Sequence, residues 1–380
     1  CMKVEQRLWK ESLGWSGALP GELGASAQLV FLFGGRSVLG DPGILAEARR
    51  AYPNAHWIGC STAGEIGGIQ VHDDSLVLTA VSFDSTRVEG AWTRIGHARE
   101  SRGVGRFLSG SLNKDGLVHV MVLSDGLRVN GTELVAGLLE ELPPEVTVTG
   151  GLSADGWAFE ETMVLCDGEP EAGAVAAIGF YGGNLRVGYG SLGGWDPFGP
   201  ERVITRSAGN VLYELDGRPA LDLYMEYLGE YAPGLPATGL RFPLSIRMNS
   251  QDDPVVRTIL GVDRESGSMV FAGDVPQGAY ARLMKANFER LIDGAAGAAR
   301  VCGGAMAGLK PELAVLISCV GRKLVLKQRI EEEVEEVRDV LGAGAVLTGF
   351  YSYGEISPFS PNAKCEMHNQ TMTITAFAEV

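Results

Sequence analysis

The chain has 380 residues, of which 45% are hydrophobic and 21% are charged, and this composition predicts a soluble globular protein with a substantial core in two domains of ordinary size. Its formal net charge is −15 and it has no long run of Lys or Arg, so neither nucleic acid nor an anionic membrane is expected as a partner. The six cysteines are scattered without a CxxC pair, no segment is apolar enough to span a bilayer, and no signal-peptide pattern is present, so we expect a cytoplasmic protein.

The first part of the chain predicts a strand–helix–strand unit. Residues before about 24 are mixed in character and predict a leading helix or arm. The apolar run at 29–33 is typical of a buried strand. Asp41 followed by Pro42 predicts a helix start, because an N-cap acceptor then precedes a proline at the first helical position. The helix is expected over 44–52.

Two further segments repeat this order of elements. An apolar strand at 118–123 is followed by an amphipathic helix near 132–142, and a strand at 313–317 is followed by a helical stripe over 326–341. Helices that alternate with buried strands predict an α/β fold, with a mixed α+β sheet architecture as the alternative, built from repeated strand–helix–strand units.

A segment of a different kind separates the second and third units. The turn-rich stretch 195–200 predicts a boundary, and strand-like runs follow between 240 and 272. We therefore expect an N-terminal domain over 27–200 and a C-terminal domain over 201–380.

The Gly-rich loops of the first and third units are near copies of one another. Residues 59–66 read GCSTAGEI, residues 349–356 read GFYSYGEI, and the counterpart in the second unit, 150–156, reads GGLSADG. A strand rich in Thr and apolar residues follows both copies, at 75–83 and 371–379. The similarity indicates an internal repeat.

The loop after the first strand of each unit carries an arginine: Arg36, Arg128 and Arg322. In α/β sheets, ligands bind at the carboxyl ends of strands, where these loops lie. The planar fork of donors on Arg suits a carboxylate or a phosphate. The alternative for each is a surface Arg that bonds loop carbonyls.

The Gly-rich loops carry the acids Glu65 and Glu355, which could hold a ligand ammonium or could instead cap backbone amides within a turn. The polar run 368–370 could face a pocket or bond backbone groups at a strand edge. The candidate ligand-binding residues are Cys60, Ser61, Thr62, Glu65, Arg128, Ser153, Asp155, Arg322, Tyr351, Tyr353, Glu355, His368, Asn369 and Gln370.

Signals for catalysis or metal binding are weaker. Cys60 could act as a nucleophile, but the sequence pairs no base with it, and a small buried residue is the commoner role of a free Cys. Cys365 and His368 have C-x-x-H spacing without a second ligand pair, so no zinc site is predicted. No P-loop, no GxGxxG that opens a helix and no GxSxG elbow occurs.

The motifs resemble those of the FIST family, the F-box and intracellular signal transduction domain. The matching stretches are 59–65, 150–155, 214–220, 349–356 and 368–372, and the similarity runs from about residue 27 to the end of the chain. The family is regarded as a sensory module that binds small ligands, with amino acids proposed, and is often fused to histidine kinase, chemoreceptor or cyclic-nucleotide signalling domains. Some members are described as haem proteins that sense nitric oxide.

The resemblance implies a small-ligand-binding sensor rather than an enzyme. We expect an amino acid or a similar small polar metabolite as ligand, with the Arg loops taking its carboxylate and Glu65 or Glu355 its ammonium. No output domain is recognised, so the signal is expected to pass to a separate protein such as a histidine kinase or a cyclic-nucleotide enzyme. A haem-based nitric oxide sensor, with His368 as the histidine inside a motif, and a hydrolase dependent on Cys60 or Ser61 are the alternatives.

A position for the site follows from the duplication. Duplicated units often pack about an approximate two-fold, which would bring equivalent loops together. We therefore expect a cleft between the domains, lined by 59–66 or 150–156 on one side and by 349–356 or 368–370 on the other.

Overall fold

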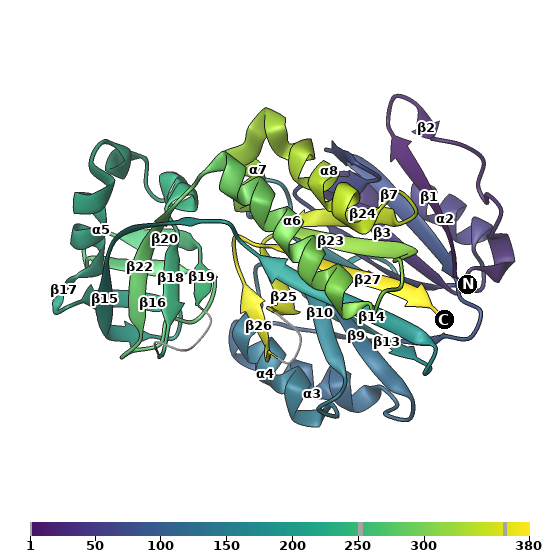
Figure 1. Ribbon diagram of the computed structural model, residues 1–380, viewed down its shortest axis with the longest axis horizontal. Coiled ribbons are helices and arrows are strands. Elements are labelled where there is room, and N and C mark those ends of the chain that lie inside the picture. Colours follow the sequence, from purple (N-terminus) through teal and green to yellow (C-terminus); the bar gives the residue numbers. More distant parts are fainter. Residues whose placement is uncertain (1, 250–253, 360–362) are drawn as a thin grey trace.

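The computed structural model describes residues 2–249, 254–359 and 363–380. Within these residues, three units of the same topology form one body, and a fourth sheet forms a separate lobe at one end of it (Figure 1). Helices and strands alternate along the chain, so the predicted α/β class is confirmed.

The first unit starts at the apolar run that predicted a strand. It consists of β3 (Leu29–Gly34), α1 (Arg36–Leu39), α2 (Pro42–Ala51), β4 (His56–Ser61), β5 (Glu65–Gly67), β6 (Gln70–His72) and β7 (Ser75–Ser82). The Asp41 carboxylate caps α2 and accepts hydrogen bonds from the next amides, with Pro42 in the first turn as expected. The N-terminal segment forms β1 (Lys3–Lys10), β2 (Gly14–Trp15) and the short η1 (Gly24–Ser26). Of the two expected alternatives, a leading helix or an arm, the helix is wrong, because β1 pairs with β7 along its whole length.

The second and third units repeat this order, and each is preceded by a strand and a helix. The second group is β8 (Arg87–Arg94), η2 (Ala98–Glu100), α3 (Ser101–Ser111), β9 (Leu117–Ser124), α4 (Gly131–Glu141), β10 (Thr147–Leu152), β11 (Met163–Cys166), β12 (Glu171–Ala172) and β13 (Ala174–Tyr181). The third is β14 (Leu185–Leu192), α6 (Phe288–Ala305), β23 (Leu313–Cys319), α7 (Val320–Leu326), η5 (Lys327–Arg329), α8 (Ile330–Leu341), β24 (Val346–Ser352), β25 (Gly354–Pro358), β26 (Cys365–His368) and β27 (Met372–Glu379).

The three units exchange hairpins in a cycle. The β5–β6 hairpin of unit 1 pairs with β24 of unit 3, the β25–β26 hairpin of unit 3 pairs with β10 of unit 2, and the β11–β12 hairpin of unit 2 pairs with β4 of unit 1. The approximate two-fold that we expected is therefore wrong, because every unit donates one hairpin and receives another. Each unit is therefore joined to both of the others by strand pairing.

Three glycines at equivalent positions permit this packing: Gly59, Gly150 and Gly349. Their partners on the adjacent parallel strands are Leu32, Val122 and Leu316. A Cβ at the three glycines would lie 2.0, 1.8 and 1.8 Å from the carbonyl oxygens of these partners. Only Gly allows the second strand of each unit to approach the first this closely.

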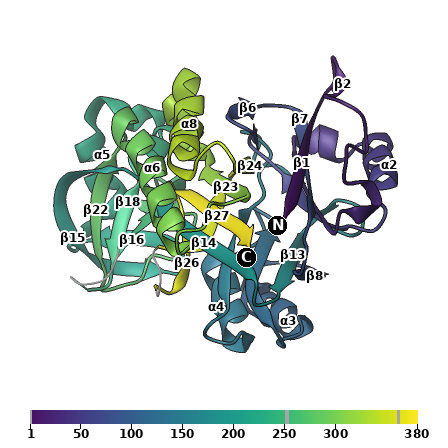
Figure 2. The ribbon, with the colours of Figure 1, turned by 45° about the vertical axis from the view of Figure 1, so that its right-hand side comes forward.

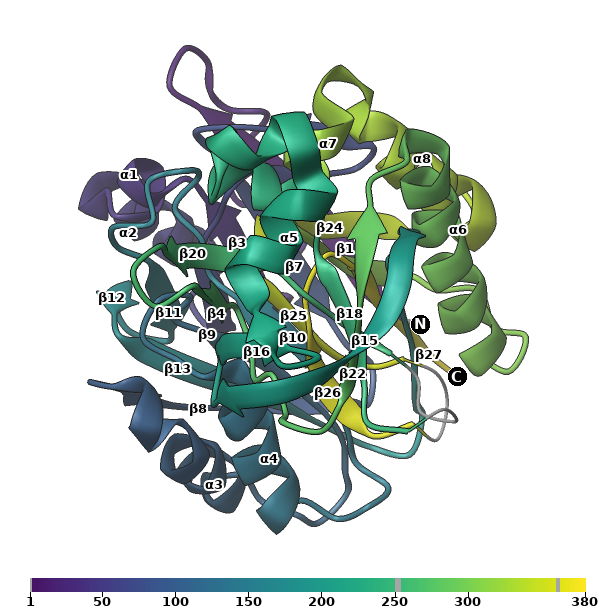
Figure 3. The same cartoon turned by 90° about the vertical axis from the view of Figure 1, so that its left-hand side faces the viewer.

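The lobe is inserted between β14 and α6 and has its own core. It contains β15 (Asp196–Ala208), β16 (Val211–Leu215), β17 (Arg218–Pro219), α5 (Ala220–Leu228), η3 (Gly229–Gly234), η4 (Ala237–Arg241), β18 (Leu244–Arg247), β19 (Val255–Arg257), β20 (Ile259–Asp263), β21 (Ser268–Phe271) and β22 (Tyr280–Lys285). Figure 3 views the molecule from the lobe side, with the body behind it. The expected division at residue 200 falls within β15.

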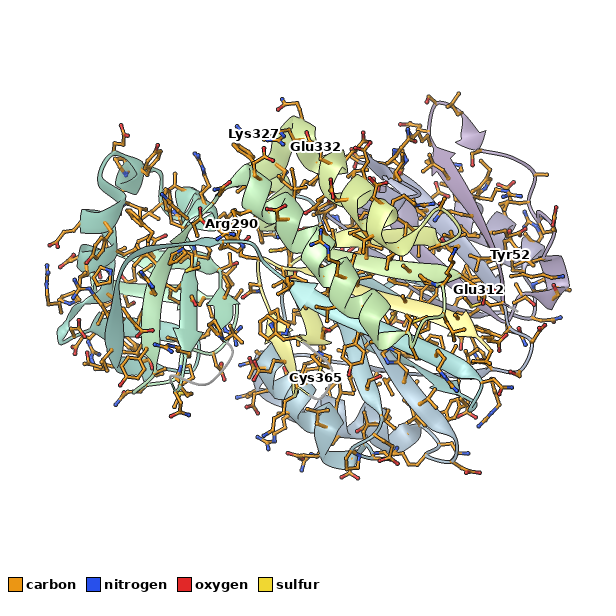
Figure 4. The ribbon with its side chains drawn as sticks, viewed as in Figure 1. Tyr52, Arg290, Glu312, Lys327, Glu332 and Cys365 are labelled. Atoms are coloured by element: carbon orange, nitrogen blue, oxygen red, sulfur yellow. The ribbon has the colours of Figure 1, made fainter. Side chains whose placement is uncertain are left out.

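The two connections between lobe and body lie side by side. Gly194 lies on the connection that leaves the body, and Arg290, labelled at this joint in Figure 4, lies just after the connection that returns to it. A Cβ at Gly194 would lie 1.8 Å from the carbonyl oxygen of Arg290. The two ends of the chain lie together on the body, away from the lobe (Figure 2), where Glu312 Oε2 accepts hydrogen bonds from Met2 N and Glu379 N, both at 3.2 Å.

Candidate ligand-binding site

Glu65, in the first Gly-rich loop, is fully buried and hydrogen bonded within its own unit. Its Oε1 accepts a hydrogen bond from the Thr62 hydroxyl, and its Oε2 accepts from Ser75 N at 3.1 Å and Ser75 Oγ at 2.6 Å. The carboxyl group thus ties the loop to the first residue of β7. Burial raises its pKa to about 7, against the lowering effect of these hydrogen bonds.

Glu355 repeats this arrangement in the third unit. Its Oε1 accepts from Ser352 Oγ at 2.6 Å, and its Oε2 accepts from Thr371 N at 3.1 Å and Thr371 Oγ1 at 2.9 Å. Burial raises its pKa to about 8. Both acids therefore hold a loop to the strand that follows it, which is the alternative to binding a ligand ammonium.

Arg322 is also buried and satisfied. Its Nε and Nη2 donate to Glu333 Oε2 at 3.0 and 2.7 Å, Nη2 also donates to Leu291 O at 2.7 Å, and Nη1 donates to Gly193 O. Glu333 in turn accepts from the Tyr351 hydroxyl at 2.7 Å. A ligand carboxylate at Arg322 would have to displace Glu333, so the predicted role is not supported by its contacts. Arg322 instead fastens α7 to both connections of the lobe.

Of the other predicted arginines, Arg128 is exposed and lies beside Gly173, and Arg36 lies 3.8 Å from the Glu160 carboxylate. In units 2 and 3 a serine, Ser124 or Ser318, stands four residues before the arginine, yet the Arg128 guanidinium is exposed and the Arg322 guanidinium is buried. The repeated position does not create a common anion site.

Cys60 and its neighbour are packed between strands. The Cys60 thiol is fully buried, and burial raises its pKa well above the ordinary value, which disfavours the thiolate that a nucleophile requires. The Ser61 hydroxyl accepts a hydrogen bond from Met163 N at 2.9 Å, and the Ser153 hydroxyl donates to Ser124 O at 2.9 Å. The hydrolase alternative finds no activated nucleophile at these residues.

His368 is the last residue of β26 and is buried. Its Nε2 bonds Ser357 O at 2.7 Å, its ring lies against Phe359 with centroids 4.1 Å apart, and its Nδ1 has no partner in the described chain. Burial lowers its pKa to about 4.

Asn369 and Gln370 face the lobe. Thr258 N donates to Asn369 Oδ1 at 3.4 Å, and Gln370 Nε2 donates to Leu240 O at 3.2 Å. Both polar side chains therefore sit at the boundary between body and lobe, next to a cavity.

A loop at this boundary is held in a strained conformation. The Asp155 carboxylate accepts the Tyr353 hydroxyl and the amides of Phe159, Glu160 and Glu161 at 2.9, 2.8 and 2.9 Å. These bonds hold Phe159 at a φ of 53°, which is uncommon for a bulky residue, with its ring stacked on Tyr353 at a centroid distance of 4.4 Å. Such strain persists where the surroundings impose it and is concentrated at functional sites.

A cavity of about 220 Å³ lies between the body and the lobe. The body contributes Ala98, Gly126, Leu127, Val129, Asn130, Leu152, Phe159, Cys319, Val320 and Tyr353. The lobe contributes Asn210, Leu240, Thr258, Leu260, Phe271, Ala272 and Gly273. We expected Leu152 and Tyr353 on opposite sides of a cleft between the domains. Both line this cavity, but they lie on the same wall, and the opposite wall comes from the lobe.

A second hollow, the polar cleft, has a volume of about 490 Å³ and lies on unit 1 beside the Gly-rich loops. Its lining includes the predicted residues Thr62, Glu65 and Asp155 together with Arg36 and Lys323. Lys323 Nζ donates to Ala63 O at 2.8 Å and to the Asp73 carboxylate.

Models of two domain families match the chain: the FIST N domain over residues 28–218 and the FIST C domain over residues 220–358. The chain belongs to the FIST family. FIST domains are sensory domains of signal transduction. The suspected resemblance is therefore confirmed, and the inserted lobe spans the junction of the two matched regions.

Two relatives of this FIST protein are themselves described as uncharacterized. An uncharacterized protein of Mycobacterium tuberculosis is 24% identical over 94% of this chain and 92% of its own length. An uncharacterized protein of Methanocaldococcus jannaschii is 26% identical over a match that covers 57% of this chain and 43% of that protein. A solved structure of cyanuric acid hydrolase from A. caulinodans aligns over 100% of this chain and 99% of its own with 9% identity, but its TM-score of 0.38 is too low to support a conclusion.

Neither His368 nor His119 of this FIST protein is placed to ligate a haem in the cavity between body and lobe. His368 is packed between a carbonyl and Phe359 and does not line the cavity, while His119 lies in the core between the hydroxyls of Thr147 and Thr149. The cavity is also smaller than the roughly 300–1,000 Å³ pockets that enclose drug-sized ligands. Among the described residues, no group of His, Cys, Asp and Glu could hold a metal ion, and no helix is long and apolar enough to cross a membrane.

The sequence did not reveal the lobe side of the cavity. Asn210, Thr258 and Phe271 lie in the insert, where no motif repeats, and the nearby sequence signals were the family-like stretch 214–220 and the polar run at 368–370.

Proposed function

We propose that this sensory domain binds its small ligand in the cavity between the body and the inserted lobe. The observation that carries the proposal is Thr258, which lines this interdomain cavity and whose hydroxyl is buried without a hydrogen-bond partner in the described chain. Leu127, Phe159 and Leu260 at the same cavity remain 38%, 43% and 49% exposed, so apolar surface is left for a ligand to cover.

Ligand binding there would alter how the lobe sits on the body. The contacts across the boundary include Arg257 Nη1 to Met367 O at 2.8 Å and Asn130 Nδ2 to Asp274 Oδ1 at 3.0 Å, which are polar and can open without exposing a large core. A ligand that touches both walls stabilises the closed arrangement by its differential affinity for it. Val320, at the start of α7, lines the cavity, so the change reaches Arg322 in the same helix and the connections it holds.

The readout is a change in lobe position that a separate signalling protein recognises. A histidine kinase or a cyclic-nucleotide enzyme remains the partner class that we propose, on the basis of the family resemblance.

The test is a thermal-shift screen of small metabolites with a cavity-filling variant, Ala272→Leu. A ligand that binds only the native state raises Tm, and the rise grows with the logarithm of its concentration once this exceeds Kd. We expect the shift in the wild-type protein to be lost in Ala272→Leu and kept in Ala25→Leu, a surface control outside the cavity. A ligand whose shift survives Ala272→Leu would place the site elsewhere.

The polar cleft favours a second candidate, an amino acid. Arg36 and Lys323 offer positive charge for a carboxylate, which would displace the Asp73 carboxylate from Lys323, and Asp74 offers negative charge for an ammonium. Titration with glycine, alanine and glutamate tests this candidate. Lys323→Gln is expected to weaken binding at this cleft while Ala272→Leu leaves it unchanged, and the reverse pattern would remove the cleft from consideration.

A further inference from the structure

The cavity between body and lobe has uncharged walls. None of its lining residues carries a charged side chain. The Cys319 thiol at one end is buried, and burial raises its pKa, so it is neutral at physiological pH. An ion placed in this cavity would lose its hydration without gaining an opposite charge, which strongly disfavours charged ligands and zwitterions.

Aromatic rings stand on the body side of the cavity. The body contributes Phe159 and Tyr353, whose rings are stacked 6° from parallel, whereas Phe271 of the lobe lines the cavity with its side chain buried in the lobe core. The Tyr353 hydroxyl is engaged by Asp155, so this residue presents its ring rather than a free polar group. An aromatic wall favours a ring as ligand, because offset stacking and edge contacts add to the gain from apolar burial.

The polar atoms left in the lining are acceptors or hydroxyls. Thr258 Oγ1 is buried without a partner in the described chain. Asn210 uses Nδ2 to donate to Phe271 O at 2.9 Å, and no hydrogen bond to its Oδ1 is formed by the described residues. Asn130, by contrast, is engaged at both ends, since Oδ1 caps α4 through Glu133 N and Nδ2 donates to the lobe. A ligand N–H or O–H would satisfy the first two residues.

The volume limits the ligand to about one ring. An apolar cavity of about 150 Å³ is large enough to bind benzene. The cavity here, at about 220 Å³, leaves room for one ring and a few substituent atoms.

We propose that the ligand is an uncharged compound with a single aromatic or heteroaromatic ring and at least one N–H or O–H donor. This inference rests on the proposed function, because it takes the cavity as the sensory site. It excludes free amino acids from this cavity, although not from the polar cleft.

The probes are phenol, benzamide and uracil as uncharged donors, benzoate and benzylammonium as charged rings of similar size, and toluene as a ring without a donor. Binding is measured by calorimetry on the full chain. We expect the uncharged donors to bind and the charged rings to bind at least about tenfold more weakly or not at all.

Two variants separate the hydrogen bond from the cavity. Thr258→Val keeps the shape and removes the hydroxyl, so the affinity for phenol should fall about tenfold while that for toluene stays the same. Thr132→Val is the matched control, because the Thr132 hydroxyl is also buried without a partner but lines a different hollow. It should change neither affinity.

The outcomes distinguish this inference from the proposed function. If a charged ring or an amino acid binds and Ala272→Leu abolishes its binding, the cavity is the site but the ligand class is wrong. If the uncharged rings bind equally well to Ala272→Leu, the cavity is not the site and both proposals fail. No binding of the uncharged rings at millimolar concentration overturns the inference, as does a Thr258→Val variant that binds phenol as well as the wild type.

Discussion

The Gly-rich loops and the cavity both contain polar side chains, but the acids of the loops are fully hydrogen bonded, whereas the Thr258 hydroxyl at the cavity has no partner in the described chain. Glu65 and Glu355 are bonded to hydroxyls and amides of their own units, and Arg322 is neutralised by Glu333. The Thr258 hydroxyl of the cavity is buried alone in the described part of the chain. A bonded group stabilises the fold, and a ligand can use it only by displacing its partner, whereas an unpartnered group is available at once.

This difference indicates that the repeated residues stabilise the contacts between the units. The polar groups available to a ligand lie instead at the inserted lobe, which interrupts the repeat. The loops recur because the hairpin exchange recurs. The cavity forms only at the boundary with the lobe, which is inserted in one of the three units. Four changes would break or sharpen this comparison.

The largest effect is expected for Gly349→Ala. The new Cβ would lie 1.8 Å from Leu316 O, in a backbone conformation with a φ of 157°, and neither strand can move without breaking the pairing. We expect a loss of about 4 kcal/mol or more in the free energy of unfolding, or failure to fold. Gly103→Ala, in α3 with open space around the new Cβ, is the control and should stabilise the protein by roughly 0.5–1 kcal/mol. Denaturant unfolding that gives similar values for the two would contradict the packing argument.

Arg322→Met should cost about 3–5 kcal/mol, because it leaves the Glu333 carboxylate buried without a counter-charge. The double variant Arg322→Met/Glu333→Met should recover most of this loss, since both charges are then absent. Chemical denaturation of the three proteins measures the effect. A single variant as stable as the wild type would show that the pair is not a necessary part of the joint.

The stability should fall as pH rises from about 6.5 to 8. The folded-state pKa values of Glu65 and Glu355 are raised to about 7 and 8, so the native state binds more protons than the unfolded chain, and each protonated carboxyl contributes a slope of up to about 1.4 kcal/mol per pH unit. The lowered pKa values of His119 and His368 act with the opposite sign, but only below about 6.5. Glu355→Gln should flatten the slope measured by urea unfolding at several pH values. An unchanged slope would mean that this carboxyl is ionised when buried.

The smallest effect on stability is expected at the cavity itself. Thr258→Val removes a hydroxyl without a partner in the described chain and should change the free energy of unfolding by less than about 0.5 kcal/mol. Thr371→Val removes a hydroxyl that bonds Glu355 at 2.9 Å and should cost about 1–3 kcal/mol. Equal costs at the two positions would remove the distinction between bonded and available groups.

The sequence correctly located the elements whose signals are local. The apolar runs at 29–33, 118–123 and 313–317 all lie in strands, and Asp41 and Pro42 mark a helix start, because burial on both faces and capping leave their pattern in consecutive residues. The repeated Gly-Glu-Ile pattern likewise marked Glu65 and Glu355 in consecutive residues. The sequence around each Glu is compatible with both a ligand contact and a hydrogen bond within a turn.

What the tertiary structure decided was the partner of each group. Ser124 and Ser318 precede Arg128 and Arg322 by the same spacing, yet one Arg is exposed and the other is buried, because only the second meets a Glu on α8 and the two connections of the lobe. The hairpin exchange and the cavity likewise join residues more than a hundred positions apart in the chain. By itself the sequence determined the strands, the helix start and the glycines that close packing requires, since these depend on local backbone and burial. Which polar groups are bonded and which are left for a ligand depends on surfaces that meet only when the chain has folded.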